Sequence, residues 1–409
     1  MAQTILYFII AFVLFDFILS KILDKLNMDT WQKPIPEKLK DLYEPEQYEK
    51  AKHYAIANNK VGMLSSTLSL LITLALLYFK GFAFIDSIAA SLSGHYILRG
   101  LIFIGILGLG SMIIGLPFGL YHTFVIEEQF GFNKTTLKTF ILDKIKGIIM
   151  GVIIGGGLYA LLCWLFKELG GNFWLVGWLI VSAFTIFLAM FYTSLILPLF
   201  NKLVPLESGE LRSKIEEYSS KVIFPLTNIF VMDGSKRSAK ANAFFSGLGA
   251  KKNIVLYDTL ISQLSQEEIT AVLAHEVGHY KKKHITKALF ISVFQMGFMF
   301  LVFGQLAASP ILAEVMGATE NSFHLSIIAF SLLFSPISMI TGILSNVYAR
   351  KNEYEADAYA KDTYAAEPLV TALKKMTVKH LSNPQPHPAY IFVHYSHPTM
   401  LQRMEALGL

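Results

Sequence analysis

Two histidines separated by three residues, with a glutamate after the first, form the clearest chemical pattern in the sequence: His275-Glu276-Val277-Gly278-His279. Residues four apart on an α-helix lie on one face, about 5–6 Å apart at Cβ, so both imidazoles can bind one cation. The glutamate can reach a metal-bound water without being a ligand. Such a match occurs by chance in about one chain in a hundred of this length. The motif therefore needs support from elsewhere in the sequence.

A catalytic zinc site needs a third protein ligand and keeps its fourth position open for water. Residues 352–357, Asn-Glu-Tyr-Glu-Ala-Asp, supply two candidates, because Glu353 and Asp357 are four residues apart. One carboxylate can ligate while the other orients a ligand histidine. The alternative is a solvated helix end beside a membrane. Two histidines and a carboxylate strongly favour zinc, although the motif alone does not separate it from other divalent ions.

The composition is that of a polytopic membrane protein. Of 409 residues, 54% are hydrophobic and 16% are charged, and the mean hydropathy is +0.49. Ordinary globular chains carry about 25% charged residues. The single cysteine, Cys163, lies in an apolar run and excludes a disulfide scaffold. The net charge of +5 is better explained by charged loops than by nucleic-acid binding, so we expect no nucleic-acid partner.

Seven stretches have the roughly 20 mostly apolar residues that a spanning helix needs. They are 4–24, 61–79, 100–120, 147–166, 173–198, 286–308 and 323–348. The first lacks a basic leading segment and carries Asp16 and Lys21, so we interpret it as a retained span and not a signal peptide. Glycines in 100–119 and 155–157 predict close helix packing, and Pro336 predicts a kink.

Basic residues predict the orientation of the spans. Residues 25–60 contain seven lysines and 121–146 contain four, whereas 306–322 contain no lysine or arginine. Because short basic loops stay in the cytoplasm, the amino terminus is predicted outside and the carboxyl terminus inside. The two water-soluble parts, 199–285 and 349–409, would then share the cytoplasmic side.

This topology divides the chain into four parts. They are five transmembrane helices with cytoplasmic loops (1–198), a segment with the HEVGH helix (199–285), spans six and seven (286–348), and a cytoplasmic tail (349–409). The two-span hairpin returns the acidic segment to the level of the histidines.

The soluble parts predict mixed α and β structure. Residues 228–232 and 253–257 predict strands, and 209–221 predict a helix. Ser265 and Glu268 form a capping box where the HEVGH helix should begin. Glycine in a helix costs about 1 kcal/mol relative to alanine, so Gly278 predicts close packing beside the metal. The expected fold class is mainly α, a seven-transmembrane-helix bundle with a cytoplasmic metal-binding part that contains a small β-sheet.

Several segments in the same order resemble the type I CAAX prenyl proteases, which are integral-membrane zinc metallopeptidases of the gluzincin type. The resemblance covers nearly the whole chain and includes the spacing of the seven spans. The matching segments are HEVGH, 352–360 (NEYEADAYA), 127–134 (EEQFGFNK), 233–238 (DGSKRS) with 242–245 (NAFF) and 254–258 (IVLYD), and 394–398 (HYSHP) with Arg403.

The resemblance implies a role for each matching residue at the metal. His275, His279 and Glu353 would ligate one Zn²⁺ per chain. Glu276 would be the general base and acid, and Asp357 would orient a ligand histidine. The seven helices would enclose a large water-filled chamber with the active site at its cytoplasmic end.

The resemblance also implies how substrate is bound. Asn242, Ala243 and Phe244 would form a strand edge that pairs with the substrate backbone. His397 and Arg403 would lie near the zinc and stabilise the oxyanion or meet the substrate carboxylate. For Arg403 the alternative is a carboxylate within the fold.

The implied substrates are prenylated proteins ending in Cys-aliphatic-aliphatic-X, cut after the lipidated cysteine. Regions 306–322 and 354–380 are shorter than in family members that carry long insertions, which suggests a bacterial inner-membrane protein. In a eukaryote the location would be the endoplasmic reticulum membrane. The first alternative function is a quality-control metalloprotease that does not depend on prenylation. The oligomeric state and the route of substrate entry stay open.

Two further alternatives follow from the motif itself. An intramembrane site-2-type protease would carry HExxH inside a span, whereas here the motif precedes span six and is followed by lysines 281–283. A channel or scaffold that stores zinc would not need Glu276. Among the other histidines, His284 is predicted to belong to a basic, lipid-facing collar with these lysines.

Overall fold

Seven long apolar helices dominate the computed structural model, which describes residues 1–226, 228–246 and 253–409. Among these residues, seven helices are long and apolar enough to cross a membrane, as predicted. They run over Ala2–Gln32, Pro45–Tyr78, Tyr96–Glu127, Leu137–Leu169, Phe173–Phe200, His284–Ala307 and Phe323–Thr363. Most extend beyond the predicted apolar stretch, because hydropathy marks the membrane part of a helix and not its soluble continuation.

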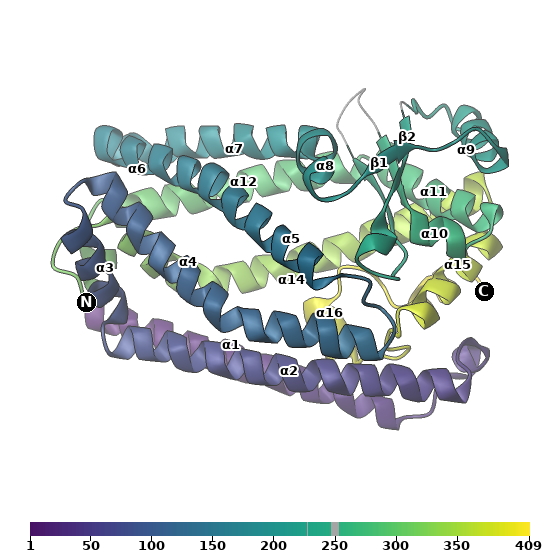
Figure 1. The fold of residues 1–409 in the computed structure, drawn as a ribbon, viewed down its shortest axis with the longest axis horizontal. Helices are drawn as coiled ribbons and strands as arrows, with labels where there is room; N and C mark the ends of the chain where they lie inside the picture. The colour runs from purple at the N-terminus through teal and green to yellow at the C-terminus, as the bar shows by residue number, and fades with distance from the viewer. Residues whose placement is uncertain (227, 247–252) are drawn as a thin grey trace.

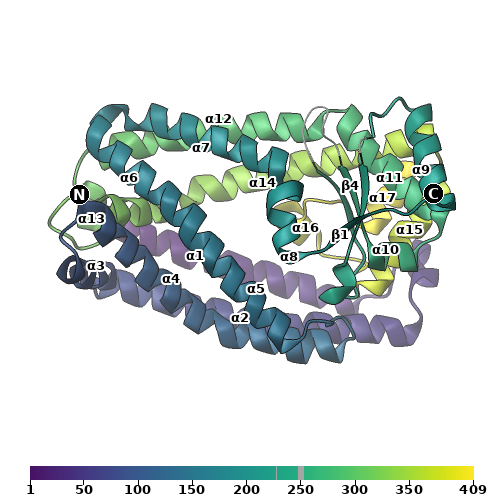
Figure 2. The ribbon, with the colours of Figure 1, turned by 45° about the horizontal axis from the view of Figure 1, so that its top comes forward.

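The spans are built from continuous and interrupted helices. Their α-helical parts are α1 (Ala2–Asp29), α2 (Pro45–Tyr78), α4 (Tyr96–Tyr121), α5 (Leu137–Met150), α6 (Gly157–Leu169), α7 (Phe173–Phe191), α8 (Leu197–Phe200), α12 (His284–Ala307) and α14 (Phe323–Thr363). A π-helical turn, Gly151–Gly156, joins α5 to α6. Two short helices, α3 (Gly81–Leu92) and α13 (Ile311–Val315), lie at the end of the bundle away from the sheet (Figure 2).

The spans pack in ring order. α1 contacts α2, α2 contacts α4, α4 contacts α6, α6 contacts α7, α7 contacts α12, α12 contacts α14, and α14 contacts α1 (Figures 1 and 2). Only 6% to 17% of the most apolar window of each span is buried inside the protein. So little burial favours a ring of helices over a solid bundle, in line with the chamber, which stays a prediction.

Most glycines of the third and fourth spans do not mark close packing, and that prediction is wrong. A Cβ would meet no atom within 4 Å at most of these positions: Gly105, Gly108, Gly110, Gly115, Gly155 and Gly157. Gly119 and Gly156 would meet one side-chain atom each at ordinary contact distance, 3.9 and 3.7 Å. Gly100 alone is tightly packed, because a Cβ there would lie 1.8 Å from the Tyr159 hydroxyl oxygen. At these positions no neighbouring atom lies close enough to require a glycine. Pro336 lies inside α14, which continues to Thr363, and the kink stays a prediction.

In the described residues, the soluble part combines a four-stranded sheet with six α-helices and a 3₁₀ turn. The strands are β1 (Leu203–Pro205), β2 (Asn228–Met232), β3 (Ala243–Ser246) and β4 (Asn253–Tyr257). The helices are α9 (Glu210–Lys221), α10 (Asp258–Gln263), α11 (Gln266–Lys281), α15 (Ala366–Lys379), α16 (Pro388–His394) and α17 (Met400–Leu407), together with the 3₁₀ turn Gly234–Lys236. The strand order is β1-β2-β4-β3, with β2 and β4 parallel and the other pairs antiparallel. Both predicted strands and the predicted helix are therefore confirmed.

One apolar core unites the soluble elements. It includes buried residues from five elements: Ile215 of α9, Leu256 of β4, Leu273 of α11, Leu369 of α15 and Met404 of α17. The predicted four-part division concerns the order along the chain. In space, residues 199–285 and 349–409 share this core.

Candidate metal centre

The helix that carries both motif histidines begins where the sequence predicts. The Ser265 side chain accepts a hydrogen bond from the Glu268 backbone N–H at 3.3 Å, and the Glu268 carboxylate accepts one from the Ser265 backbone N–H at 2.8 Å. This capping box satisfies two backbone donors at the start of α11. Lys375 of α15 forms an ion pair with Glu268 at 2.7 Å. The start of α11 is thus fixed by its own sequence and by a neighbouring helix.

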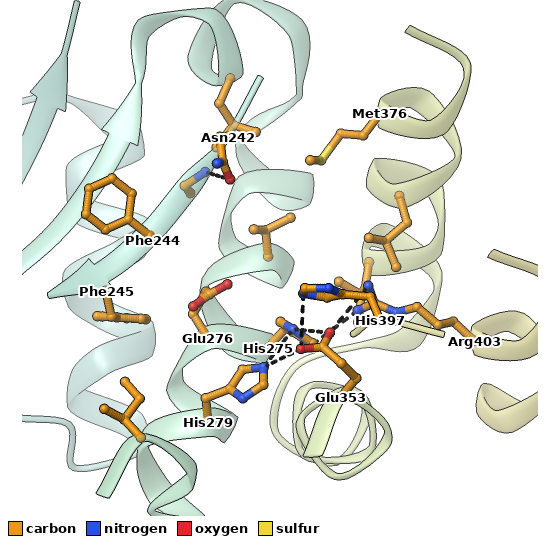
Figure 3. Close-up of a pocket in the computed structure, with 16 residues that line it drawn as sticks. Asn242, Phe244, Phe245, His275, Glu276, His279, Glu353, Met376, His397 and Arg403 are labelled. Carbon is orange, nitrogen blue, oxygen red and sulfur yellow. Dashed lines mark hydrogen bonds and ion pairs between the residues drawn. The ribbon is translucent and has the colours of Figure 1, made fainter. Parts of the chain in front are cut away.

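α14 brings the predicted third ligand to the histidines. Glu353 lies 3.4 Å from Nε2 of His275 and 3.2 Å from Nε2 of His279, and the two Nε2 atoms are 3.2 Å apart (Figure 3). One ligand atom from each of the three residues lies within 4.8 Å of the others. The structure therefore brings together the three side chains that the sequence predicts as ligands.

Close packing of α11 on α14 makes this meeting possible. A Cβ on Gly278 would lie 3.0 Å from both Cα and O of Ala356, and 3.1 Å from Cβ of Tyr359. These are mostly backbone atoms, which cannot move aside as a flexible side chain can. The glycine inside the motif therefore has the packing role that the sequence predicts.

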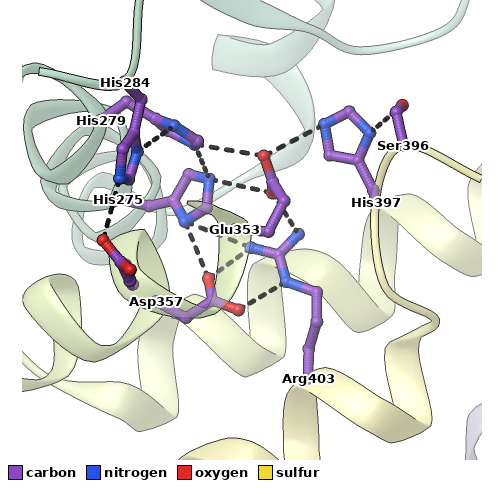
Figure 4. Close-up of polar contacts among 9 residues, drawn as sticks. His275, His279, His284, Glu353, Asp357, Ser396, His397 and Arg403 are labelled. Atoms are coloured by element: carbon purple, nitrogen blue, oxygen red, sulfur yellow. Dashed lines mark hydrogen bonds and ion pairs between the residues drawn. The ribbon is translucent and has the colours of Figure 1, made fainter. Parts of the chain in front are cut away.

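His275 is held from behind by a buried ion pair. Its Nδ1 lies 2.8 Å from Oδ1 of Asp357, and Arg403 donates to both oxygens of that carboxylate, through Nε at 2.8 Å and through Nη2 (Figure 4). Asp357 is 1% exposed and Arg403 is 7% exposed. Burial alone would lower the pKa of His275. The Asp357 and Glu353 carboxylates outweigh this effect and raise the pKa to about 9 in the metal-free site. The metal-free site thus favours a protonated His275.

Arg403 contacts a carboxylate of the fold, whereas the resemblance implies a contact with the oxyanion or the substrate carboxylate. Its guanidinium pairs with Asp357, and its Nη1 lies 3.8 Å from Glu353. This arrangement favours the alternative in which Arg403 binds a carboxylate within the fold. A contact with substrate stays a prediction.

His279 is held from behind by another histidine. Nδ1 of His284 lies 3.0 Å from Nδ1 of His279 (Figure 4). Nε2 of His284 lies 3.2 Å from Oε2 of Glu355. His284 is 3% exposed, so the prediction of a lipid-facing residue is wrong. The reason is the left-handed backbone of Lys283, with φ of 58°, which ends one helix and turns the next residue back toward the site.

Glu276 lines a cavity of about 370 Å³ beside the histidines (Figure 3). Burial in the cavity wall raises the pKa of this carboxyl above its ordinary value. The mostly exposed side chain of His397 also lines the cavity, with Nε2 3.4 Å from Oε1 of Glu353, and Ser396 contacts its Nδ1 at 2.9 Å. Both predicted residues therefore lie beside the metal-ligand cluster.

The predicted substrate-binding strand borders the same cavity. β3 is one of the two edge strands of the sheet and pairs with β4. Asn242, Ala243 and Phe244 line the cavity, and the Asn242 side chain accepts a hydrogen bond from the Ala243 N–H at 2.8 Å. An edge strand leaves a row of backbone donors and acceptors available for another chain.

Comparisons with known families decide the class of this protein. A family model described as the CAAX prenyl protease N-terminal region, with five membrane helices, matches residues 25–202. The model of peptidase family M48 matches residues 205–408. The chain belongs to peptidase family M48.

Known M48 relatives match over almost their full length. The CAAX prenyl protease 1 homologue of Oryza sativa is 34% identical over 100% of this chain and 98% of that protein. CAAX prenyl protease 1 of Saccharomyces cerevisiae is 34% identical over 91% of this chain and 88% of that protein. The crystal structure of S. mikatae Ste24p superimposes with a TM-score of 0.92 at 33% identity, covering 98% of each chain. The predicted fold class and the resemblance are confirmed, and the chain is a multi-pass membrane metallopeptidase.

Family membership and the position of the motif helix each remove one alternative. An M48 peptidase is an enzyme, so the zinc-storing scaffold is excluded. The site-2-type alternative is wrong, because HEVGH lies in α11, outside the seven apolar spans.

Sequence reasoning missed the contact between His284 and Glu355. The signal available was a histidine soon after the motif and a second carboxylate beside Glu353. Spacing along the chain does not predict that they meet.

Proposed function

We propose that this M48 peptidase is a zinc metalloendopeptidase that hydrolyses the peptide bond after a prenylated C-terminal cysteine. The observation that carries the proposal is one cavity bordered by the metal-ligand cluster, by Glu276 and by the edge strand β3. We place it on the cytoplasmic side because residues 25–60 and 121–146 are rich in lysine. The membrane would be the bacterial inner membrane, or the endoplasmic reticulum in a eukaryote.

The donors fit a single Zn²⁺ per chain. Two imidazoles and a carboxylate with an open fourth position are a known catalytic zinc set. Oε2 of Glu353 is buried without a hydrogen-bond partner, which suits an oxygen that ligates a cation. His275, His279 and Glu353 would hold the ion, and Asp357 would fix the orientation of His275.

Glu276 would move the proton during hydrolysis. Zinc held by His275, His279 and Glu353 would supply Lewis-acid chemistry, which polarises a scissile carbonyl and lowers the pKa of a water from about 15.7 toward about 7. Glu276 accepts the proton of the attacking water and returns it to the leaving amine. Burial raises the pKa of this carboxyl above its ordinary value, which favours its acting as a proton acceptor. His397 would donate a hydrogen bond to the oxyanion.

The substrate would bind as an added strand with its lipid near the membrane. The backbone at Asn242 to Phe244 can pair with an extended peptide, a form of β-augmentation. Ile285, in the first turn of span α12, also lines the cavity. The cavity therefore reaches the level at which a membrane helix begins, where a prenyl chain can remain in apolar surroundings.

The test uses two matched peptides that end in a CAAX sequence, one farnesylated and one not, incubated with the purified protein. Glu276→Gln serves as the inactive control and should cleave at least about a hundredfold more slowly while still binding zinc. Glu367→Gln, on an exposed part of α15, is the matched variant that should cleave normally.

Cleavage restricted to the farnesylated peptide would support prenyl-protein processing. Equal cleavage of both peptides would keep the zinc mechanism and assign the protein to general membrane-protein quality control. Near-normal turnover by Glu276→Gln would contradict the role of that glutamate.

A further inference from the structure

His284 is buried beside the metal-ligand cluster without belonging to it. It begins α12, and its ring lies 5.1 Å from the ring of His279, centroid to centroid, at an interplanar angle of 76°. The rings approach through their Nδ1 atoms, which are 3.0 Å apart. Two nitrogens at this distance are held by one shared proton, so one ring donates and the other accepts.

A cation held by His275, His279 and Glu353 would fix which ring donates. Nε2 of His279 faces the Glu353 carboxylate and Nε2 of His275, so this nitrogen is the one available to a cation. The proton of a neutral His279 must then reside on Nδ1, and Nδ1 of His284 must accept it. The remaining proton of His284 lies on Nε2, which faces Oε2 of Glu355 at 3.2 Å. All three contacts thus agree with one proton arrangement.

The local backbone is shaped to produce this contact. On a continuous helix a residue five positions after His279 would lie about 140° away around the axis. α11 ends at Lys281, and Lys283 adopts a left-handed conformation (φ 58°, ψ 32°) before α12 begins. A left-handed conformation is unfavourable for a non-glycine residue. The chain therefore accepts a strained turn at the point that directs His284 toward His279.

We propose that His284 is a positioning residue for the metal site. It accepts the Nδ1–H of His279, so that Nε2 of His279 stays unprotonated and faces the cation, while Glu355 fixes the tautomer of His284. The proposal rests on the metal-binding role proposed for His279. Such outer contacts commonly change metal affinity by about 10- to 100-fold when removed.

Two substitutions separate positioning from packing. His284→Asn keeps an acceptor, because the amide oxygen can take the place of Nδ1. His284→Leu introduces an apolar side chain of similar size and removes the hydrogen-bond acceptor. His53→Leu, at an exposed position of α2, is the control. Each full-length protein is purified in detergent, stripped of metal and titrated with zinc against a chelator of known affinity, and thermal unfolding of the metal-free forms is recorded.

We expect His284→Leu to bind zinc about 10- to 100-fold more weakly than wild type, with His284→Asn much closer to wild type. The unfolding temperatures of the metal-free forms should agree. Wild-type affinity in His284→Leu would overturn the proposal. An equal loss of affinity in both variants would also overturn it, because the acceptor would then not be the cause.

A spectroscopic measurement on wild type decides the matter even where His284→Leu does not fold. The ¹⁵N chemical shifts of His279 in the zinc-bound protein should show a protonated Nδ1, and a proton on Nε2 would refute the arrangement. Failure of the metal site itself has a different signature. If His279→Ala binds zinc as tightly as wild type does, His279 is not a zinc ligand. His284 then has no ligand to position.

Discussion

The two histidines of the HEVGH motif are supported in different ways. Behind His275 stand Asp357 and Arg403, which form a buried ion pair from α14 and α17. Behind His279 stand a second imidazole and Glu355, whose side chain is 36% exposed. Charge-assisted hydrogen bonds are stronger than neutral ones, and a buried charge that loses its partner is costly. The two sides of one proposed metal site should therefore respond unequally to substitution.

Removing the buried carboxylate should have the largest effect. Asp357→Ala leaves the guanidinium of Arg403 buried without its partner, and breaking such a pair typically costs about 3–5 kcal/mol of stability. Zinc affinity should fall by at least the 10- to 100-fold expected of an outer contact. Chemical denaturation and chelator competition measure the two effects. If Asp357→Ala loses no more zinc affinity than His284→Leu does, the two sides of the site do not contribute unequally.

Separating the two helices should weaken both sides together. Gly278→Ala would place a Cβ 3.0 Å from the backbone of Ala356, so α11 and α14 must move apart. Overpacking typically costs about 1–3 kcal/mol, against a gain of about 1 kcal/mol in helix propensity. We expect lower zinc affinity and a lower unfolding temperature. Gly147→Ala in α5, where a Cβ meets no atom within 4 Å, is the control and should show neither change.

Acid should weaken zinc binding through the His275 side. The pKa of His275 in the metal-free site is about 9, so at pH 7 this ring is protonated before zinc binds. Binding must release that proton, and affinity should fall about tenfold per pH unit below pH 9. Calorimetry in two buffers of different ionisation enthalpy should report the release of about one proton. Zinc affinity that is constant between pH 7 and pH 8.5 would contradict this.

The smallest effect should come from the exposed end of the His279 side. Glu355→Gln keeps an oxygen that accepts from His284, and it removes only the charge. We expect less than about a fivefold loss of zinc affinity, equivalent to about 1 kcal/mol. The same chelator competition measures it, with His53→Leu as the control. A loss as large as that of Asp357→Ala would show that the two sides are equivalent.

Local sequence properties determined much of this protein. Hydropathy is summed over neighbouring residues, so it located the seven spans. The capping box at Ser265 fixed the start of the motif helix, and i, i+4 spacing put His275 and His279 on one face. The hairpin of spans six and seven then predicted that Glu353 returns to the histidines, because two crossings bring the chain back to the same side.

Tertiary structure alone decided how these parts are supported. Glycine content did not reveal that most glycines of the third and fourth spans face open space, since packing depends on the angle between helices. Composition placed His284 in a lipid-facing collar, whereas the left-handed turn at Lys283 buries it against His279. Hydropathy and helical spacing describe a residue's neighbours along one element. The contacts behind the metal site join residues from four helices, and those depend on how the elements are turned toward one another.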